Sequence, residues 1–277
     1  MKKQFNKIYI EITNVCNLDC SFCPKTNRTP EFMSFELFKE IITQVKPLCK
    51  EITLHVMGEP TLHPQFKEFV NYAKEENVII NLTTNGTNLS STLLNTAIKK
   101  INFSIHSITD NFPKDNNQLK KIIEFTKQKR DDLIIIYRLW NINDTSNKEI
   151  FELLEKEFDI KINNPDKKGS TELINNTYIQ YDWSFQWPDT NTENNSNNGY
   201  CHALSTHIGI LSNGTVVPCC LDNQGNIALG NIKRDKLIDI LTSKRALKMK
   251  KGFCERKLVE EMCKKCTYIN RLERNKI

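Results

Sequence analysis

The sequence predicts an α/β fold from Lys7 to Asn163, followed by a smaller C-terminal domain. Short runs rich in isoleucine and valine alternate in this region with segments of helical periodicity, which is typical of βα repeats around a parallel sheet. The chain has 277 residues, of which 39% are hydrophobic and 26% charged, as expected for a globular protein of one or two domains. Such repeats fit a doubly wound sheet or a barrel, either complete or partial.

Each strand is expected where a short apolar run is bounded by polar residues, and each helix where apolar residues recur at helical spacing. The runs expected to form strands are Lys7 to Thr13, Glu51 to Met57, Val78 to Thr83, Ile101 to His106, Leu133 to Trp140 and Ile160 to Asn163. The segments expected to form helices are Ser34 to Lys46, Pro64 to Glu76, Ser90 to Lys99, Asn117 to Lys129 and Asn147 to Phe158. Ser34 is a suitable N-cap, because Leu37 and Phe38 follow it with helical apolar spacing.

The composition changes after Asn163 and becomes most polar from Asp189 to Gly199, which is rich in Asn, Thr and Ser. A segment of this kind is too polar to pack, so we expect a flexible loop there. The sequence therefore predicts a core domain over residues 1–182, a linker over 183–200 and a second domain over 201–277.

The second domain is expected to contain a hairpin and a helix. Ile208 to Leu211 and Thr215 to Pro218 flank Ser212-Asn213-Gly214, and Asn-Gly between two apolar runs is a strong hairpin signal. A helix is expected from Asp235 to Lys250. This domain is thus predicted to be a small α+β unit.

The net charge of +6 is concentrated near the C-terminus, because from Lys233 to Ile277 there are 15 Lys or Arg against 6 Asp or Glu, a balance of +9 that leaves −3 for the remainder. A solvated helix face is the simplest interpretation, and it is favoured over nucleic-acid binding because aromatic residues are not interleaved with the cations. A third interpretation is the docking of an acidic electron donor.

The sequence also excludes membrane spanning, because the longest apolar stretch runs only from Leu133 to Tyr137. The Met-Lys-Lys-Gln start is not followed by the hydrophobic region of a signal peptide. We therefore expect a cytoplasmic protein whose ten cysteines bind metal or clusters in a reducing compartment, rather than forming disulfides.

Three cysteines, Cys16, Cys20 and Cys23, stand in Cys-x3-Cys-x2-Cys spacing directly after the first expected strand. Three thiolates cannot close a four-iron cluster, so one iron would stay open to bind a small molecule and pass it an electron. A zinc site or knuckle is the alternative, although no histidine follows within the loop and His55 is the nearest. The motif therefore predicts a redox enzyme.

The segment Cys16-Asn-Leu-Asp-Cys20-Ser-Phe-Cys23 resembles the signature loop of the radical S-adenosylmethionine (radical SAM) superfamily. The resemblance implies that the amino and carboxylate groups of SAM chelate the open iron of a 4Fe-4S cluster. One-electron reduction then yields a 5′-deoxyadenosyl radical, which abstracts a substrate hydrogen. The resemblance also selects a partial, six-stranded TIM-like (β/α)6 barrel among the possible folds.

Further residues match the family pattern for SAM binding. Gly58-Glu59-Pro60 matches the Gly-Glu-Pro element, whose backbone and Glu receive the SAM amino group, although the tripeptide alone would be only a turn. Phe22 is expected to border the adenine, with ordinary packing as its alternative. The remaining candidates lie where strands end, at the mouth of the sheet, and suit ribose or carboxylate contacts: Thr83, Thr84, Asn85, Ser104, His106 and Arg138.

Arg138 is the strongest of these candidates, because a guanidinium inside an apolar strand needs an anionic partner such as the SAM carboxylate. A salt bridge to a neighbouring acidic residue is the alternative. His106 is more often a hydrogen-bonded structural histidine than a catalyst.

A second set of cysteines lies near the C-terminus: Cys201, Cys219, Cys263 and Cys266. Four thiolates can close a second cluster completely, and a zinc ribbon is the alternative on spacing alone. The arrangement resembles the auxiliary-cluster domains called Twitch and SPASM that follow many radical SAM cores, and the single Cys-x2-Cys favours the shorter, one-cluster Twitch type. Two 4Fe-4S clusters and SAM are therefore the expected cofactors.

Three cysteines remain. Cys220 adjoins a presumed ligand and is a candidate hydrogen-atom donor to a substrate radical, although alternation along a strand would equally explain its place. Cys254 is either an additional ligand or a free thiol. Cys49 is expected to be a core residue without a role.

The cysteine spacing is most similar to that of the 2-deoxy-scyllo-inosamine dehydrogenase type, in which a carbinol hydrogen is removed and the resulting radical is oxidised through the auxiliary cluster. Only Met1 to Val15 precede the first motif, so no leader-peptide-binding domain is expected, which favours a small polar substrate such as a sugar or cyclitol. A flavodoxin- or ferredoxin-type protein is the expected electron donor. Two alternatives stay open: an epimerase or other modifier of a peptide or aminoglycoside that uses Cys220, and a zinc- or iron-sulfur-bearing nucleic-acid-binding module.

Overall fold

The structure is a computed structural model that describes residues 4–112, 117–142, 147–163, 167–184, 186–188 and 195–274. The chain divides into two compact units. The terminal unit comprises Met1–Val15, Pro24–Gly58 and Phe185–Ile277, and the central unit comprises Cys16–Cys23 and Glu59–Ser184. Each unit is described by itself.

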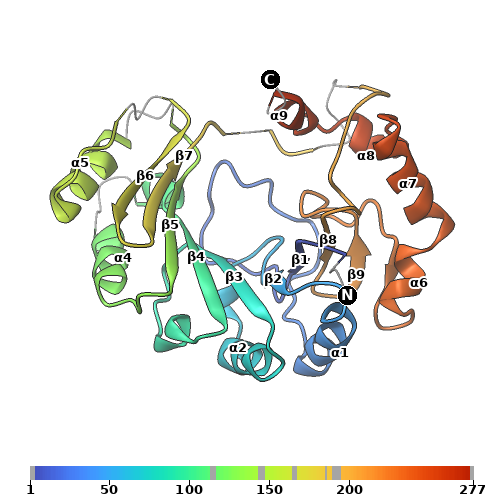
Figure 1. Cartoon of the computed structure of the whole chain (residues 1–277), viewed down its shortest axis with the longest axis horizontal. Helices are drawn as coiled ribbons and strands as arrows, with labels where there is room; N and C mark the ends of the chain where they lie inside the picture. Colours follow the sequence, from blue (N-terminus) through green and yellow to red (C-terminus); the bar gives the residue numbers. More distant parts are fainter. Residues whose placement is uncertain are drawn as a thin grey trace. The chain divides into compact units, whose positions relative to one another are not determined.

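The central unit is built on a mainly parallel sheet with helices along it (Figure 1). Its strands in spatial order are β3 (Ile79–Thr84), β4 (Ile98–Ser104), β5 (Ile134–Leu139), β7 (Thr177–Tyr181) and β6 (Gly169–Ile174), of which only β6 is antiparallel to its neighbour. Its helices are α2 (Phe66–Glu75), α3 (His106–Asn111), α4 (Asn117–Lys127) and α5 (Asn147–Phe158), with 3₁₀ turns η1 (Pro60–Leu62) and η2 (Ser91–Leu94). Phe103 and Tyr137 are fully buried on adjacent strands, as expected for a sheet whose faces are covered.

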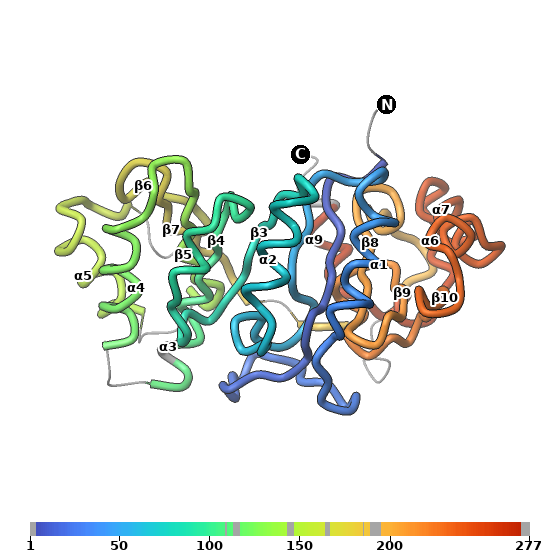
Figure 2. Tube along the Cα trace, turned by 90° about the horizontal axis from the view of Figure 1, so that it is seen from below, coloured from blue at the N-terminus to red at the C-terminus, as the bar shows by residue number. Residues whose placement is uncertain are grey.

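The terminal unit also contains a sheet, in the order β10 (Gly230–Asn231), β9 (Thr215–Val217), β8 (His207–Ile210), β1 (Lys7–Ile10) and β2 (Glu51–Thr53). β1 runs parallel to both β2 and β8, with Ile8 opposite Ile52 and Ile208. In Figure 2 the orange β8 lies beside the blue N-terminal part of the chain. The predicted hairpin is thus confirmed as β8 and β9, and it extends the sheet that begins with the first strand.

Helix α1 (Phe35–Val45) of the terminal unit forms as the sequence predicts. The Ser34 hydroxyl accepts a hydrogen bond from the Leu37 backbone N–H at 3.2 Å, which caps the helix. The helix buries Leu37, Phe38, Ile41, Ile42 and Val45 on one face. The C-terminal helices of the unit are α6 (Leu237–Leu241), α7 (Lys244–Cys254), α8 (Glu261–Lys264) and α9 (Ile269–Arg274).

The strand predicted at Ile160 to Asn163 is wrong, and β7 takes its place in the parallel sheet. The Ile162 N–H donates to the Glu155 carboxylate of α5 at 2.8 Å, and the Ile160 N–H donates to the Glu155 carbonyl at 3.2 Å, so this segment is bound to the end of α5 instead of pairing with a strand. A further hairpin, formed by β6 and β7, was not predicted. It turns at Asn176 with a φ of 56°, a conformation that asparagine tolerates.

Two helix predictions need correction. The helix expected at Ser90 to Lys99 is only the 3₁₀ turn η2, because the Arg130 guanidinium binds the Leu94 and Asn95 carbonyls (2.8 and 2.9 Å) that a longer helix would use. The helix expected at Asp235 to Lys250 is split into α6 and α7. Ser243 causes the break, since its hydroxyl accepts from the Ala246 N–H at 3.3 Å and starts a new helix.

The flexible loop predicted at Asp189 to Gly199 lies partly outside the described residues. Residues 195–199 are described, and there the prediction is wrong, because the backbone pairs with the C-terminal segment. The Ser196 N–H donates to the Lys264 carbonyl at 2.9 Å, and the Gly199 N–H donates to the Arg256 carbonyl at 3.0 Å. Among the described residues, no helix is both long and apolar enough to cross a bilayer.

Candidate active site

The first cysteine motif forms a loop at one end of the central unit. Cys16 is exposed, Cys23 is half-buried and Cys20 is buried, and the Cys23 N–H donates to the Cys20 carbonyl at 3.1 Å. Burial, together with the nearby charges of Asp110 and the other two thiols, raises the pKa of Cys20 to about 11. Burial also raises the pKa of Cys16, to which Glu59 and Cys23 contribute. Thiolates held this close are stable only beside a cation, so the donor set fits a ligated iron cluster.

Two asparagine side chains donate hydrogen bonds to these thiols. Asn111 Nδ2, at the end of α3, lies 3.1 Å from Cys20 Sγ, and Asn85 Nδ2 lies 3.9 Å from Cys16 Sγ. Asn85 was predicted from its place after a strand, but Asn111 was not. No local pattern marks Asn111, which is 91 residues from its partner along the chain.

Glu59 joins two of the predicted loops inside the central unit. It is only 2% exposed, and its carboxylate accepts hydrogen bonds from the Thr61 N–H and hydroxyl, the Thr84 hydroxyl and the Asn85 N–H, at 2.6 to 3.1 Å. Burial raises the pKa of this carboxyl, while these donors counteract the rise. The side chain therefore fixes the end of β3 against the turn that starts at Pro60. Direct contact of Glu59 with the SAM amino group stays a prediction.

Gly58 belongs to the terminal unit, where its backbone packs against that of Thr13 and Asn14. Its φ is 75°, and a Cβ at this position would lie 2.4 Å from the Thr13 carbonyl oxygen. Only glycine fits such a close approach. The Gly58 backbone was expected to approach a ligand closely. In the structure it closely approaches the backbone of Thr13 and Asn14, which leads to Cys16.

The other predicted residues of the central unit gather around an aromatic group. Phe22 and His106 have ring centroids 4.4 Å apart, His106 stacks on Trp140 at 6.4 Å, and the Arg138 guanidinium lies 4.4 Å above the Trp140 ring. His106 Nδ1 lies 2.8 Å from the Arg138 carbonyl, and burial lowers the pKa of His106 to about 4, so the imidazole is neutral at pH 7. Trp140 was not predicted as a site residue. Ser104 stands opposite Arg138 in the β4–β5 register.

The second cysteine set forms in the terminal unit. Burial raises the pKa of Cys201 to about 11, and raises the pKa of Cys219, Cys263 and Cys266 as well, with mutual repulsion among the thiols contributing. Three segments distant in sequence therefore carry these thiols: the segment that leads to β8, the end of β9, and α8 with the turn after it. Cys220 lies near this set, because its charge contributes to the raised pKa of Cys201, Cys219 and Cys266.

Two further cysteines lie apart from that set. Cys254 is exposed at the end of α7. Cys49 is buried, as predicted, and its thiol donates to the Glu51 carbonyl at 2.9 Å. Among the described residues, no three His, Cys, Asp or Glu side chains meet in a way that suits a single metal ion. A cluster holds its thiolates further apart than one ion does, because each iron takes one of them.

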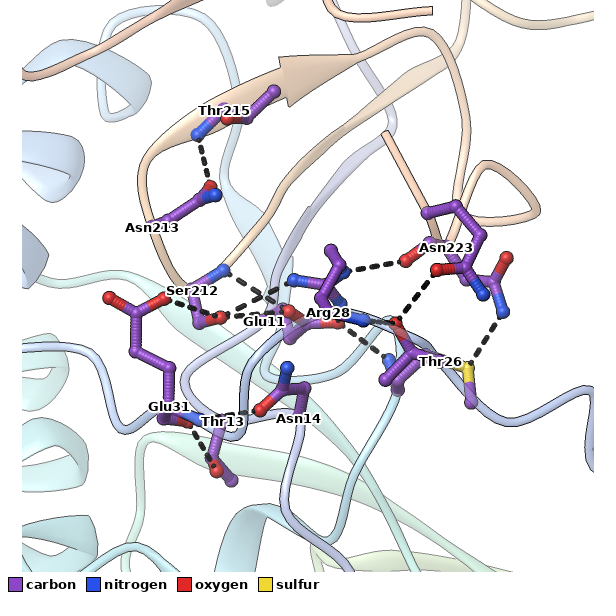
Figure 3. A network of polar contacts seen from close by, with 12 residues as sticks. Glu11, Thr13, Asn14, Thr26, Arg28, Glu31, Ser212, Asn213, Thr215 and Asn223 are labelled. Atoms are coloured by element: carbon purple, nitrogen blue, oxygen red, sulfur yellow. Dashed lines mark hydrogen bonds and ion pairs between the residues drawn. The ribbon is translucent and has the colours of Figure 1, made fainter. Parts of the chain in front are cut away.

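A buried polar network in the terminal unit was also missed (Figure 3). Glu11 is fully buried, and Arg28 Nη2 donates to its carboxylate at 2.7 Å. The same carboxylate accepts from the Met57 N–H at 3.0 Å and from the Ser212 N–H and hydroxyl at 3.1 Å. Arg28 Nε donates to the Asn223 carbonyl at 2.8 Å. The network thus ties together the chain after Cys23, the chain before Gly58 and the chain after Cys220.

Comparison with known proteins identifies the family. A model of the radical SAM superfamily matches residues 10–164, more than half of the chain. The chain belongs to the radical SAM superfamily. A second model, for the SPASM iron-sulfur cluster-binding domain, matches residues 201–267 of this radical SAM protein. The predicted cofactors, SAM and 4Fe-4S clusters, are those of the two matched families and are confirmed. The number of auxiliary clusters, for which the sequence favoured the Twitch type, stays a prediction.

Curated relatives match only part of this radical SAM chain. The cofactor-modifying protein of tungsten-containing aldehyde ferredoxin oxidoreductase from Pyrococcus furiosus is 36% identical over 91 residues, which are 31% of this chain and 26% of that protein. The mycofactocin maturase MftC of Mycobacterium tuberculosis is 33% identical over 82 residues, 29% of this chain and 21% of the maturase. The chain therefore spans about a quarter of the length of these relatives.

Solved structures match almost the whole chain. BtrN, in complex with AdoMet and 2-DOIA, is 20% identical with a TM-score of 0.62, and covers 96% of this chain and 94% of its own. Streptococcus suis SuiB, bound to its precursor peptide SuiA, is 16% identical with a TM-score of 0.64, and covers 98% of this chain and 73% of its own. These likenesses confirm the predicted partial barrel fold.

Proposed function

We propose that this radical SAM enzyme oxidises an alcohol of a small polar molecule, such as a sugar or cyclitol, and passes the second electron to an auxiliary 4Fe-4S cluster. The observation that carries the proposal is the gathering of Cys201, Cys219, Cys263 and Cys266 in the terminal unit. Four thiolates close a cluster, and a closed cluster transfers electrons rather than binding substrate. The near-complete mutual coverage with BtrN supports this reading.

In this proposal Cys16, Cys20 and Cys23 hold the SAM-binding cluster. SAM bound there supplies, on one-electron reduction, a 5′-deoxyadenosyl radical that removes a hydrogen atom from the substrate carbinol. Glu59, which accepts hydrogen bonds from Thr84 and Asn85, would receive the SAM amino group together with the backbone of Gly58-Glu59-Pro60. In the same proposal Phe22 borders the adenine, Ser104 and His106 contact the ribose or the carboxylate, and Arg138 pairs with the SAM carboxylate.

The proposed reaction is a two-electron oxidation of an alcohol to a carbonyl. One electron enters with SAM, and methionine and 5′-deoxyadenosine leave. The substrate would lose one hydrogen atom to the 5′-deoxyadenosyl radical, which thereby becomes 5′-deoxyadenosine. It would then lose one electron to the auxiliary cluster and one proton to solvent or a base, and would become a carbonyl. The electron that entered is thereby recovered, so a small amount of reductant should support many turnovers.

A second candidate function is epimerisation or another modification of a peptide or aminoglycoside, with Cys220 as hydrogen-atom donor. The closeness of Cys220 to three of the auxiliary thiols favours keeping this candidate, because a fifth thiol is not needed to close the cluster. The likeness to SuiB, whose structure holds a precursor peptide, points the same way. The nucleic-acid-binding alternative is set aside, because the family model covers more than half of the chain.

The test is anaerobic incubation of the iron-reconstituted protein with SAM, dithionite and a panel of aminocyclitols, aminoglycosides and peptides in deuterated water. A carbonyl product without deuterium supports the dehydrogenase, whereas deuterium at an unoxidised carbon supports the epimerase. Cys220→Ala should leave the first activity and stop the second, and Cys254→Ala, at an exposed thiol outside the set, is the matched control. Absence of 5′-deoxyadenosine with every substrate and with SAM alone would refute both.

A further inference from the structure

The end of helix α3 holds the first cysteine loop at three successive residues. Asn111 Oδ1 accepts from the Asp19 N–H at 3.0 Å, and Asn111 Nδ2 donates to Cys20 Sγ at 3.1 Å. The Asp110 carboxylate accepts from both the N–H and the hydroxyl of Ser21, the latter at 2.8 Å. All these residues belong to the central unit.

Helix α3 is itself fixed to the sheet, so its side chains are pre-organised. The Ser107 hydroxyl donates to the Ser104 carbonyl at 2.6 Å, and His106 Nδ1 lies 2.8 Å from the Arg138 carbonyl on β5. Asn111 Nδ2 also donates to the Ser107 carbonyl at 2.9 Å, one turn back along the helix. The amide is therefore held in place before any cluster binds.

Asn111 and Asp110 act on the Cys20 sulfur with opposite sign. An N–H donor stabilises negative charge on a thiolate ligand, and this charge grows when the cluster gains an electron, so such hydrogen bonds raise the reduction potential. A nearby carboxylate repels the added electron and lowers the potential.

We propose that the last two residues of α3 set the reduction potential of the SAM-binding cluster, Asn111 raising it through its hydrogen bond to Cys20 and Asp110 lowering it through its charge. Both are positioning residues, since they act through the cysteine loop. The inference rests on the proposed assignment of that cluster to Cys16, Cys20 and Cys23.

The test is a redox titration of the anaerobic, reconstituted protein, followed by electron paramagnetic resonance, with the SAM-binding cluster recognised by its spectral change on adding SAM. Asn111→Asp keeps the acceptor for the Asp19 N–H but replaces the donor to Cys20 by a charge. We expect an approximately tenfold lower ratio of reduced to oxidised cluster at a fixed potential, equivalent to a shift of about −59 mV for one electron. Asn111→Leu, which adds no charge, should shift the potential in the same direction by less.

Asp110→Asn should shift the potential in the opposite direction, because the negative charge is lost while one acceptor oxygen stays for the Ser21 N–H and the Ser21 hydroxyl can accept from the new amide. Asn95→Asp is the matched control, since its side chain caps the Ala97 N–H at 2.9 Å, far from any thiol in sequence, and it should leave the potential unchanged. If the two residues had a purely structural role, the reduction potentials of the Asn111 and Asp110 variants would shift in the same direction or not at all. Either result overturns the proposal.

If the Asn111→Asp variant fails to assemble the cluster, the Asp110→Asn variant tests the inference by itself. A reduction potential equal to or lower than that of the wild type would then refute it. If the wild-type protein itself shows no SAM-responsive signal, or Cys20→Ala retains one, the assignment of the cluster fails instead. The two failures are therefore distinguishable.

Discussion

His106 is a buried, neutral histidine in the middle of the predicted SAM-binding group. Its ring contacts Phe22 and Trp140, and its Nδ1 lies beside the Arg138 carbonyl. Burial, aided by the Arg138 charge, lowers the pKa of His106 to about 4, below the ordinary value of 6.5. Protonation is therefore easier in the unfolded chain than in the folded one.

This difference predicts acid sensitivity. As the pH falls from 7.5 to 5.5, the unfolded chain takes up a proton at His106 and the folded protein does not, so stability should fall by about 1 kcal/mol from this residue. His207, whose pKa is also lowered to about 4 by burial, should add a similar loss. His106→Gln should reduce the pH dependence of the free energy of unfolding, measured in urea at both pH values. Equal pH dependence in wild type and variant would contradict this account.

The metal-ligating candidates were predictable because thiol spacing is a local pattern, whereas their partners were not. Cys16, Cys20 and Cys23 stand within one short loop, but Asn111 reaches Cys20 only through the fold. The same holds for Glu11, whose partner Ser212 is 201 residues away in sequence. A hydrogen bond between residues so far apart in sequence produces no local pattern from which either partner could be predicted.

The secondary structure shows a similar division. The strand β5 was predicted because Leu133 to Tyr137 is a continuous apolar run, which burial on both faces selects. The strand β4 (Ile98–Ser104) was predicted to start only at Ile101, because Lys99 and Lys100 interrupt its apolar residues. The strand β7 (Thr177–Tyr181) was missed because it contains no run of consecutive apolar residues. The segment from Ile160 to Asn163, directly after α5, was predicted as the sixth strand in its place. Hydrophobicity alone does not reveal that the Ile162 N–H binds the Glu155 side chain of α5 instead of a neighbouring strand.

The junction between β1 and the first cysteine motif depends on Gly58 in the terminal unit. Gly58→Ala would place a methyl group 2.4 Å from the Thr13 carbonyl oxygen, in addition to the strain of a φ of 75°. We expect a destabilisation of about 3 kcal/mol or more, with loss of iron uptake. Gly225→Ala is the matched control, because Gly225 has the same φ of 75° but a Cβ there would meet side-chain atoms alone, the nearer on the flexible Leu211 at 3.2 Å.

Urea unfolding of both variants measures the difference. Strain alone should cost the Gly225 variant about 1–2 kcal/mol. Equal losses in the two variants would show that the contact with Thr13 is unimportant.

The charge of the chain is divided unevenly, with +9 from Lys233 to Ile277 and −3 elsewhere. Helix α7 presents much of the positive charge, because Lys244, Lys248 and Lys251 are exposed around Leu247, which is 50% exposed. Arg245 of the same helix binds Glu260, beside α8 and Cys263, with two contacts of 2.8 Å. The basic face is therefore attached directly to the segment that carries an auxiliary-cluster candidate.

An acidic flavodoxin- or ferredoxin-type electron donor should use this face, because complementary charges steer association. Replacing Lys244 and Lys248 by Glu should slow reduction by reduced flavodoxin about tenfold at low ionic strength. The difference should shrink as salt approaches 0.1 M, where screening acts over about 10 Å. The rate is followed by stopped-flow absorbance of the clusters. Replacing Lys67 and Lys74 of α2 by Glu is the control, because it makes the same change of net charge on another exposed helix face. Dithionite-driven SAM cleavage, which needs no docked protein, should be unchanged in all variants. Equal rates for the α7 and α2 variants would place the donor elsewhere.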